Sequence, residues 1–153
     1  MTRIIGSPLA SSFFIITAAL LLPGCPSKEP STPTILEQRA QPFVQDVPVP
    51  RGFELDARKS DHRIIAGRRS VNHIYRGSES PLTVRNFYVH YMPMSQWQLQ
   101  DEKLYAAVYV LKFKKNDEKC DIRIERVPTG MFEGKPTQIQ ATIKSIYAET
   151  PAD

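Results

Sequence analysis

The sequence is poor in the residue patterns that mark metal sites and catalytic sites. None of its three histidines (His62, His73 and His90) has a partner at metal-ligand spacing, and no CxxC, HxH or HExxH pattern occurs. It also contains no GxSxG nucleophile motif and no glycine-rich phosphate loop. We therefore expect no catalytic residue, no metal and no cofactor, and we interpret the chain as non-enzymatic.

A strong excess of charge is missing as well. The formal net charge is +4, and removal of the first 24 residues with Arg3 would leave +3, which is too little to suggest a nucleic-acid partner. One basic cluster stands out, tempered by Asp56 and Asp61; its members are Arg58, Lys59, Arg63, Arg68 and Arg69. It could contact phosphate-bearing lipid or an acidic partner, or it could be an ordinary solvated face.

One apolar run lies near the N-terminus. Arg3 and the free amine give a short positive region, residues 9–22 are mostly apolar, and the small Gly24 follows. This layout predicts a secretory signal peptide over residues 1–24. The run is too short to span a bilayer comfortably, because a transmembrane helix needs about 20 apolar residues.

The run ends in Leu22-Pro23-Gly24-Cys25, which resembles the lipobox of bacterial lipoproteins, although Pro23 departs from the usual residue at its position. The resemblance implies cleavage before Cys25, a diacylglyceryl thioether on its sulfur and a further acyl chain, such as palmitate, on its amine. It also implies export and a membrane anchor, with the outer membrane facing the periplasm as the expected address. Several acyl chains together would hold the protein stably.

If Cys25 carries lipid, Cys120 is the one remaining thiol in an oxidising compartment. Such a thiol is either a buried core residue or a reactive group, and its place in an alternating segment favours burial.

The segment after the predicted cleavage site has a different composition. Residues 25–46 are rich in proline and polar residues, which predicts a flexible linker. Val47 to Pro50 are expected to pack as an arm on one α+β domain spanning residues 47–149, and residues 150–153 form a tail.

The clearest element is a hairpin. Residues 105–114 and 119–126 alternate apolar and polar side chains, and Asn116-Asp117 suits a two-residue turn. The predicted register places one apolar face on the pairs Phe113–Cys120, Leu111–Ile122 and Tyr109–Ile124.

A helix is predicted to start at Ser80-Pro81, with Ser80 as the N-cap, and to end at Pro93. Its apolar face is formed by Val84, Phe87, Tyr88 and Tyr91, which should cover the apolar face of the hairpin. Further strands are expected around Trp97, over residues 139–147 and within residues 52–76, with Gly67-Arg68 as a candidate turn. The fold class is therefore α+β, an antiparallel sheet of about four to six strands with one main helix, about 81–92, packed on one face.

A second resemblance covers most of this domain. The segments that carry it are Val47-Pro48-Val49-Pro50-Arg51-Gly52-Phe53, Tyr75-Arg76-Gly77, Phe87-Tyr88 and Met92-Pro93 before Trp97. They look like a pattern in small bacterial lipoproteins of unassigned function, and the resemblance implies no activity.

Two hypotheses about function remain open. The first is a lipid-anchored, non-catalytic envelope lipoprotein that acts as an interaction or assembly module with another envelope protein. The alternative is a small-ligand or lipid carrier, or a sensor, with a pocket between helix and sheet. A filled interface there would argue against the alternative, and an apolar cavity of roughly 300 Å³ or more would favour it.

Overall fold

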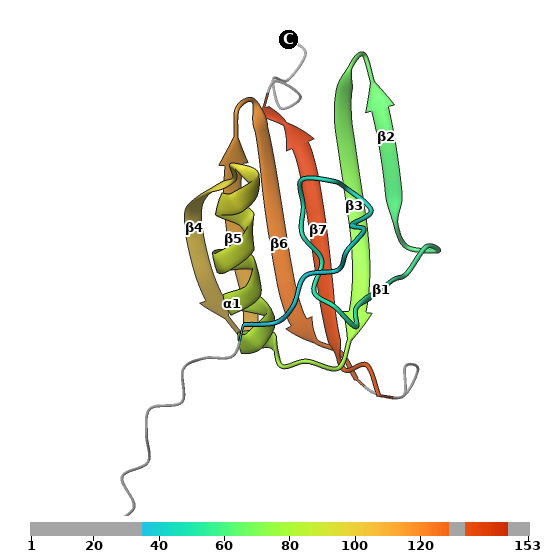
Figure 1. Cartoon of the computed structure of the whole chain (residues 1–153), viewed down its shortest axis with the longest axis vertical. Coiled ribbons are helices and arrows are strands. Elements are labelled where there is room, and N and C mark those ends of the chain that lie inside the picture. The colour runs from blue at the N-terminus through green and yellow to red at the C-terminus, as the bar shows by residue number, and fades with distance from the viewer. Residues whose placement is uncertain (1–34, 129–133, 147–153) are drawn as a thin grey trace, which may run out of the picture. The chain divides into compact units, whose positions relative to one another are not determined.

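The computed structural model describes residues 35–128 and 134–146 (Figure 1). The lipobox residues Leu22, Pro23, Gly24 and Cys25 lie outside the described residues, as does the predicted tail. Among the helices of the described part, none has the length and apolarity needed to cross a membrane.

The described chain forms a seven-stranded antiparallel sheet with one α-helix. Its strands are β1 (Glu54–Leu55), β2 (Asp61–Ile65), β3 (Arg68–Gly77), β4 (Gln98–Tyr105), β5 (Val108–Lys115), β6 (Glu118–Arg126) and β7 (Thr137–Ser145). The order is β1-β3-β7-β6-β5-β4, and β2 also pairs with β3. The predicted α+β class is confirmed, but the sheet is larger than the expected four to six strands, because residues before the helix supply three strands.

The two ends of the sheet carry different turns. At the end that we call the Glu118 end, the β5–β6 turn lies beside the finish of β7 and the β2–β3 turn. The opposite end, called the Gly77 end, holds the finish of β3, the start of β7 and the β4–β5 turn. These names locate the features described below.

The predicted hairpin register is confirmed in β5 and β6. Phe113 pairs with Cys120, Leu111 with Ile122 and Tyr109 with Ile124. The Asn116-Asp117 turn is also as predicted, and Asn116 has a φ of 50°. The turn between β2 and β3 falls at Ala66-Gly67, one residue earlier than expected; both residues have positive φ, as in a type I′ turn, and Gly67 favours this conformation at the second central position.

Helix α1 (Pro81–Tyr91) confirms the predicted start. The Ser80 hydroxyl accepts a hydrogen bond from the backbone N–H of Thr83 at 3.1 Å, and Pro81 occupies the first turn. The chain then continues as the 3₁₀ helix η1 (Met92–Ser95), so Pro93 lies within this second turn. α1 packs over β5 and β6, as Figure 1 shows, and buries Val84, Phe87 and Tyr88.

β4 runs further than the sequence suggested. A strand was expected around Trp97, and β4 extends beyond it to include Asp101, Glu102 and Lys103, which pair with β5. An edge strand tolerates such charges because one side of it faces solvent, and a register shift between Leu99 and Asp101 makes this edge irregular.

Residues 35–53, which we call the arm, cross the other half of the same sheet face, over β7 and β3 (Figure 1). The arm buries Val44, Val47, Val49 and Phe53 in the core, and Pro48 and Pro50 are buried as well. The backbone bridges Gln38–Pro50 and Val44–Val47 fold the arm onto itself. Packing was expected only from Val47 onward, but the packed segment already includes Leu36 and Val44, which contact the core, and Asp46, which binds charged residues of the sheet.

The finish of β3 is shaped to receive the arm. A Cβ atom on Gly77 would lie 2.6 Å from the ring of Phe53. Since real Cβ atoms do not approach other heavy atoms so closely, a residue without a side chain is needed where Phe53 rests. The arm therefore fits a specific place on the sheet.

Candidate functional site

The apolar face of the sheet is covered in two halves by different parts of the chain. In the half under α1, the interface is filled by Val84, Phe87 and Tyr88, whose exposed fractions are all 0%. The rings of Phe87 and Tyr88 meet edge to face at 5.3 Å between centroids. The pocket that the alternative hypothesis expected between helix and sheet is therefore occupied by protein side chains.

The arm covers the second half, and part of this cover is itself exposed. The Phe43 ring lies over His73 and Tyr75, with ring centroids 6.4 and 6.1 Å apart, yet Phe43 itself remains 46% exposed. Arg39 stacks on the outer side of Phe43 at 4.9 Å from the ring centroid. The cover over His73 and Tyr75 thus includes a half-exposed aromatic ring with a guanidinium stacked on it.

Polar groups are buried beneath this cover. His73 Nδ1 and the Tyr75 hydroxyl form a hydrogen bond of 3.0 Å. The Tyr88 hydroxyl, on α1, is buried without a hydrogen-bond partner among the described residues. Burial raises the pKa of Tyr88 well above its usual value, and the nearby Tyr75 and Cys120 raise it further. These groups lie where the helix half meets the arm half.

Burial disfavours the charged forms of both His73 and Cys120. Burial, with a smaller contribution from His62, lowers the pKa of His73 below its usual value. Burial also raises the pKa of the Cys120 thiol, and Cys120 is fully buried, as its alternating position predicted. A thiol of this kind is a poor nucleophile, because the thiolate is the reactive form.

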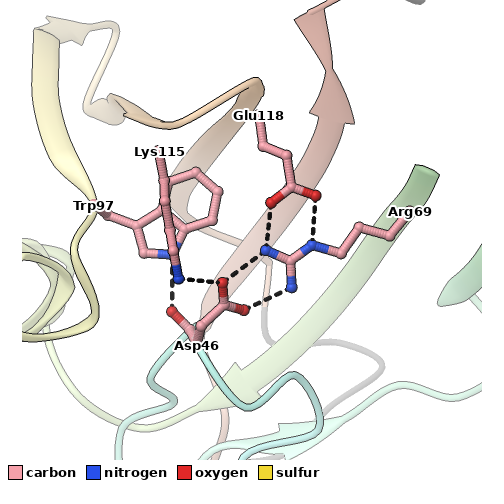
Figure 2. A network of polar contacts seen from close by, with 5 residues as sticks. All are labelled: Asp46, Arg69, Trp97, Lys115 and Glu118. Atoms are coloured by element: carbon pink, nitrogen blue, oxygen red, sulfur yellow. Dashed lines mark hydrogen bonds and ion pairs between the residues drawn. The ribbon is translucent and has the colours of Figure 1, made fainter. Parts of the chain in front are cut away.

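The tip of the arm is fastened by a cluster that we call the Asp46 network, which Figure 2 shows in full; its members are Asp46, Arg69, Trp97, Lys115 and Glu118. Arg69 donates two hydrogen bonds to the Asp46 carboxylate, both 2.7 Å, and two to Glu118, both 2.6 Å. Lys115 Nζ lies 2.9 Å from Asp46, and Trp97 Nε1–H donates to the Asp46 carbonyl oxygen at 2.8 Å.

The network is balanced in charge, with two carboxylates and two cations. Partial burial alone would raise the pKa of Asp46, but hydrogen bonds and charge from Arg69 and Lys115 outweigh it and hold the pKa at about 2. The same contact with Asp46, followed by that with Glu118, raises the pKa of Arg69. Because its acids and bases satisfy one another, the network is a structural fastening between the arm and the Glu118 end.

The structure does not gather the predicted basic cluster into one site. Arg58 and Lys59 line a surface hollow of about 550 Å³ beside Arg76. Arg68 lines another of about 450 Å³ at the β2–β3 turn, and Arg69 belongs to the Asp46 network. Arg63 pairs with Asp61 at 2.9 Å on the exposed surface.

The histidines do not form a metal centre with other residues in the described part. His62 and His73 are neighbours, with ring centroids 5.9 Å apart, and His90 lies on α1. No group of three His, Cys, Asp or Glu side chains within residues 35–128 and 134–146 is arranged to hold a metal ion.

Asp46, Lys115 and Glu118 were not singled out from the sequence. Asp46 was placed in the flexible linker, and the other two flank a hairpin turn, where solvated charge is common. A signal existed in Val44-Gln45-Asp46-Val47, because two valines around a polar pair favour a tight turn with both valines buried. Nothing local identifies the partners of Asp46, since they lie 23 to 69 residues away.

Comparison with known proteins identifies the family. A protein-family model described as START domain-like matches residues 59–141, more than half of the chain, and the chain therefore belongs to the START domain-like family. A search of curated proteins and a search of solved structures find no match. The matched residues run from just before β2 into β7 and include α1, but they leave out the arm and β1.

Proposed function

We propose that this protein is an exported, lipid-anchored and non-catalytic binding protein that takes an apolar molecule onto the sheet face beneath the arm. The observation that carries the proposal is the division of that face. The residues that match the family model, 59–141, supply most of the sheet and α1, and α1 covers only half of the sheet face. The arm, which lies outside the match, covers the other half. A START domain-like match is compatible with a ligand-binding fold.

The chemistry of the covered half defines the ligand class. Its floor consists of inward-facing side chains of β3 and β7, among them Val71, Tyr75, Ile139, Ala141 and Ile143. The valines and the phenylalanine of the arm pack against these side chains and keep them out of water. A ligand that replaces the arm must therefore be similarly apolar. The Tyr88 hydroxyl offers one hydrogen bond at the border of the site, which suits a ligand with a single polar group.

The arm is suited to exchange with such a ligand. Its hold on the sheet rests on a few side chains and the Asp46 network, whereas α1 is continuous with the sheet at both ends. Weakening the network should therefore open the arm half and leave the helix half closed.

A matched pair of variants tests binding. Asp46→Asn weakens the arm's fastening, while Glu102→Gln weakens a comparable ion pair, in which Arg85 Nε donates to Glu102 at 2.7 Å on the helix side. The acylated protein in lipid nanodiscs is titrated with dansyl-labelled undecanoic acid, and energy transfer from Trp97, the one tryptophan, is measured. We expect more transfer in Asp46→Asn than in wild type and no change in Glu102→Gln. Equal transfer in all three proteins would contradict binding beneath the arm.

The anchor has its own test. Mass spectrometry of the N-terminal peptide from native membranes should find Cys25 as the first residue with its sulfur and amine acylated, and Cys25→Ser should retain residues 1–24 and no acyl mass. An unmodified Cys25 thiol would contradict the lipid anchor while leaving the binding proposal standing.

A further inference from the structure

The β4–β5 hairpin ends in an exposed apolar turn. Leu104 and Tyr105 are 61% and 83% exposed, and Ala106-Ala107 form the two-residue turn that follows them. Turns of this length normally carry Asn, Asp or Gly, which are polar or lack a side chain. Four consecutive residues thus present apolar surface at a place where turn chemistry favours other residues.

The backbone of this turn is unfavourable for alanine. Ala106 and Ala107 have φ values of 46° and 64°, in the left-handed region that side chains disfavour. The β2–β3 turn combines Ala66 with Gly67 at such positions, and the β5–β6 turn has Asn116, so only the β4–β5 turn of the described sheet has alanine at both positions. The two alanines do not favour this backbone conformation, and they make the turn apolar.

A leucine of α1 extends the apolar surface. Arg85 and Glu102 join α1 to β4, and Leu82 precedes Arg85 by one helical turn while Leu104 follows Glu102 by two residues on the same face of β4. Since α1 and β4 run in opposite directions, both steps lead toward the Gly77 end, so both leucines lie at that end of the molecule. Leu82 is 55% exposed. We call Leu82, Leu104, Tyr105, Ala106 and Ala107 the tip patch.

The arm begins at the same end of the sheet. Gln38 pairs with Pro50, the Arg39 side chain donates to the carbonyl oxygen of Phe53, and Phe53 rests on Gly77. In Figure 1 the first described residues lie at this end, next to the start of α1. The ten residues from Cys25 to Thr34 span at most about 35 Å. An acylated Cys25 would therefore hold the first described residue, at the Gly77 end, within about 35 Å of the bilayer.

Building on the proposed acylation of Cys25, we propose that the tip patch inserts into the surface of the bilayer that holds the lipid anchor. Leucine side chains gain from leaving water, and tyrosine suits the membrane interface because its ring is apolar and its hydroxyl is polar. The anchor supplies the proximity that a small patch needs, since a tethered contact forms at high effective concentration. The insertion fixes the orientation of the domain, with the Glu118 end turned away from the membrane.

The cysteine content permits a clean test. Cys120 is fully buried and an acylated Cys25 is blocked, so a newly introduced surface cysteine can be labelled selectively. Tyr105→Cys places an environment-sensitive NBD dye in the tip patch. Ile65→Cys is the matched control, because Ile65 is 64% exposed at the last position of β2, beside the hairpin turn at the Glu118 end, as Tyr105 is at the last position of β4. Both acylated proteins are reconstituted into vesicles of phosphatidylethanolamine and phosphatidylglycerol.

We expect the dye at position 105 to brighten and to resist bleaching by aqueous dithionite, and the dye at position 65 to remain fully accessible. Leu104→Ser should weaken the protection at position 105. The proposal is overturned if both dyes are equally accessible or equally protected, as they would be if the turn served a protein partner instead.

A second pair separates this inference from the anchor. The same labelled proteins carrying Cys25→Ser lack the anchor, and we expect position 105 to respond to vesicles only at roughly a hundredfold higher lipid concentration or more. If native Cys25 proves unmodified, the proposal of a lipid anchor is wrong, but the Cys25→Ser pair still tests insertion of the tip patch. A response to vesicles confined to position 105 supports insertion. No response at position 105 overturns it.

Discussion

At the scale of single residues, the hydroxyl groups of two buried tyrosines contribute to the free energy of unfolding with opposite signs. The Tyr75 hydroxyl is satisfied by His73 at 3.0 Å, while the Tyr88 hydroxyl lacks a partner among the described residues. A buried polar group costs free energy when it is left without a hydrogen bond, and it contributes modestly when it has one. The two residues therefore offer a paired test of the site.

Removing the two hydroxyls should change stability in opposite directions. We expect Tyr75→Phe to lower the free energy of unfolding by about 1 kcal/mol, because His73 loses its partner, and Tyr88→Phe to leave it unchanged or raise it by about 1 kcal/mol. Urea unfolding followed by circular dichroism measures both. A loss in Tyr88→Phe as large as that in Tyr75→Phe would mean that the Tyr88 hydroxyl is already bound.

The Asp46 network should make stability depend on acid. The pKa of Asp46 is about 2 in the folded protein and 3.8 for the unperturbed group, so the folded state binds fewer protons. The stabilisation is fully present above about pH 4 and is lost as the pH falls through about 2, and its size is roughly 2 kcal/mol. Unfolding measured from pH 5 to pH 1.5 should show this loss in wild type relative to Asp46→Asn. Parallel pH profiles for the two proteins would refute the prediction.

At the scale of elements, the three tight hairpin turns differ in how well their residues suit them. Ala66-Gly67 and Asn116-Asp117 contain residues that tolerate positive φ, whereas Ala106-Ala107 do not. Strand pairing along β4 and β5 nevertheless holds this third turn in place. The β4–β5 hairpin is therefore less stable than it would be with turn residues that favour positive φ.

Replacing Ala106-Ala107 by Asn-Gly should stabilise the protein. We expect the free energy of unfolding to rise by about 1–2 kcal/mol, because both residues would then suit the left-handed backbone. Ala66→Asn, which improves a single position, serves as the smaller control. Chemical denaturation measures the gain, and a loss of stability in the double variant would show that the alanines make contacts that the fold needs.

At the scale of the whole molecule, the two covers of the apolar face differ in how they are attached. α1 is covalently continuous with β3 and, through η1, with β4, and it also buries its apolar side chains over β5 and β6. The arm joins the sheet through the short β1 and otherwise through side chains, and its own backbone hydrogen bonds, such as Arg39 N–H to the Val49 carbonyl, are internal. The arm should therefore open independently of the sheet.

Hydrogen exchange should detect this opening. Amides of the arm, such as those of Arg39, Val47 and Arg51, are expected to exchange with a smaller opening free energy than amides of β6. Asp46→Asn should accelerate exchange in the arm and at Trp97 Nε1 without affecting β6. A common opening free energy for arm and sheet would show that they unfold as one unit.

Several features of this fold were predictable because they depend on neighbours in sequence. The β5–β6 register follows from alternation around Asn116-Asp117, and the start of α1 follows from Ser80-Pro81. Residues 35–46 were not predictable in this way. Their proline and polar content favours a flexible linker, and their packing depends on an apolar sheet face that exists only once β3 and β7 have paired.

By itself, the sequence determined the α+β class, the helix, the central hairpin and the burial of Cys120, because hydrophobic periodicity and turn chemistry act over a few residues. Only the tertiary structure decided that the arm covers half of the face and that Asp46 meets Arg69, Lys115 and Glu118. Those contacts join residues up to 69 positions apart, and their geometry is created by strand pairing that no local pattern records.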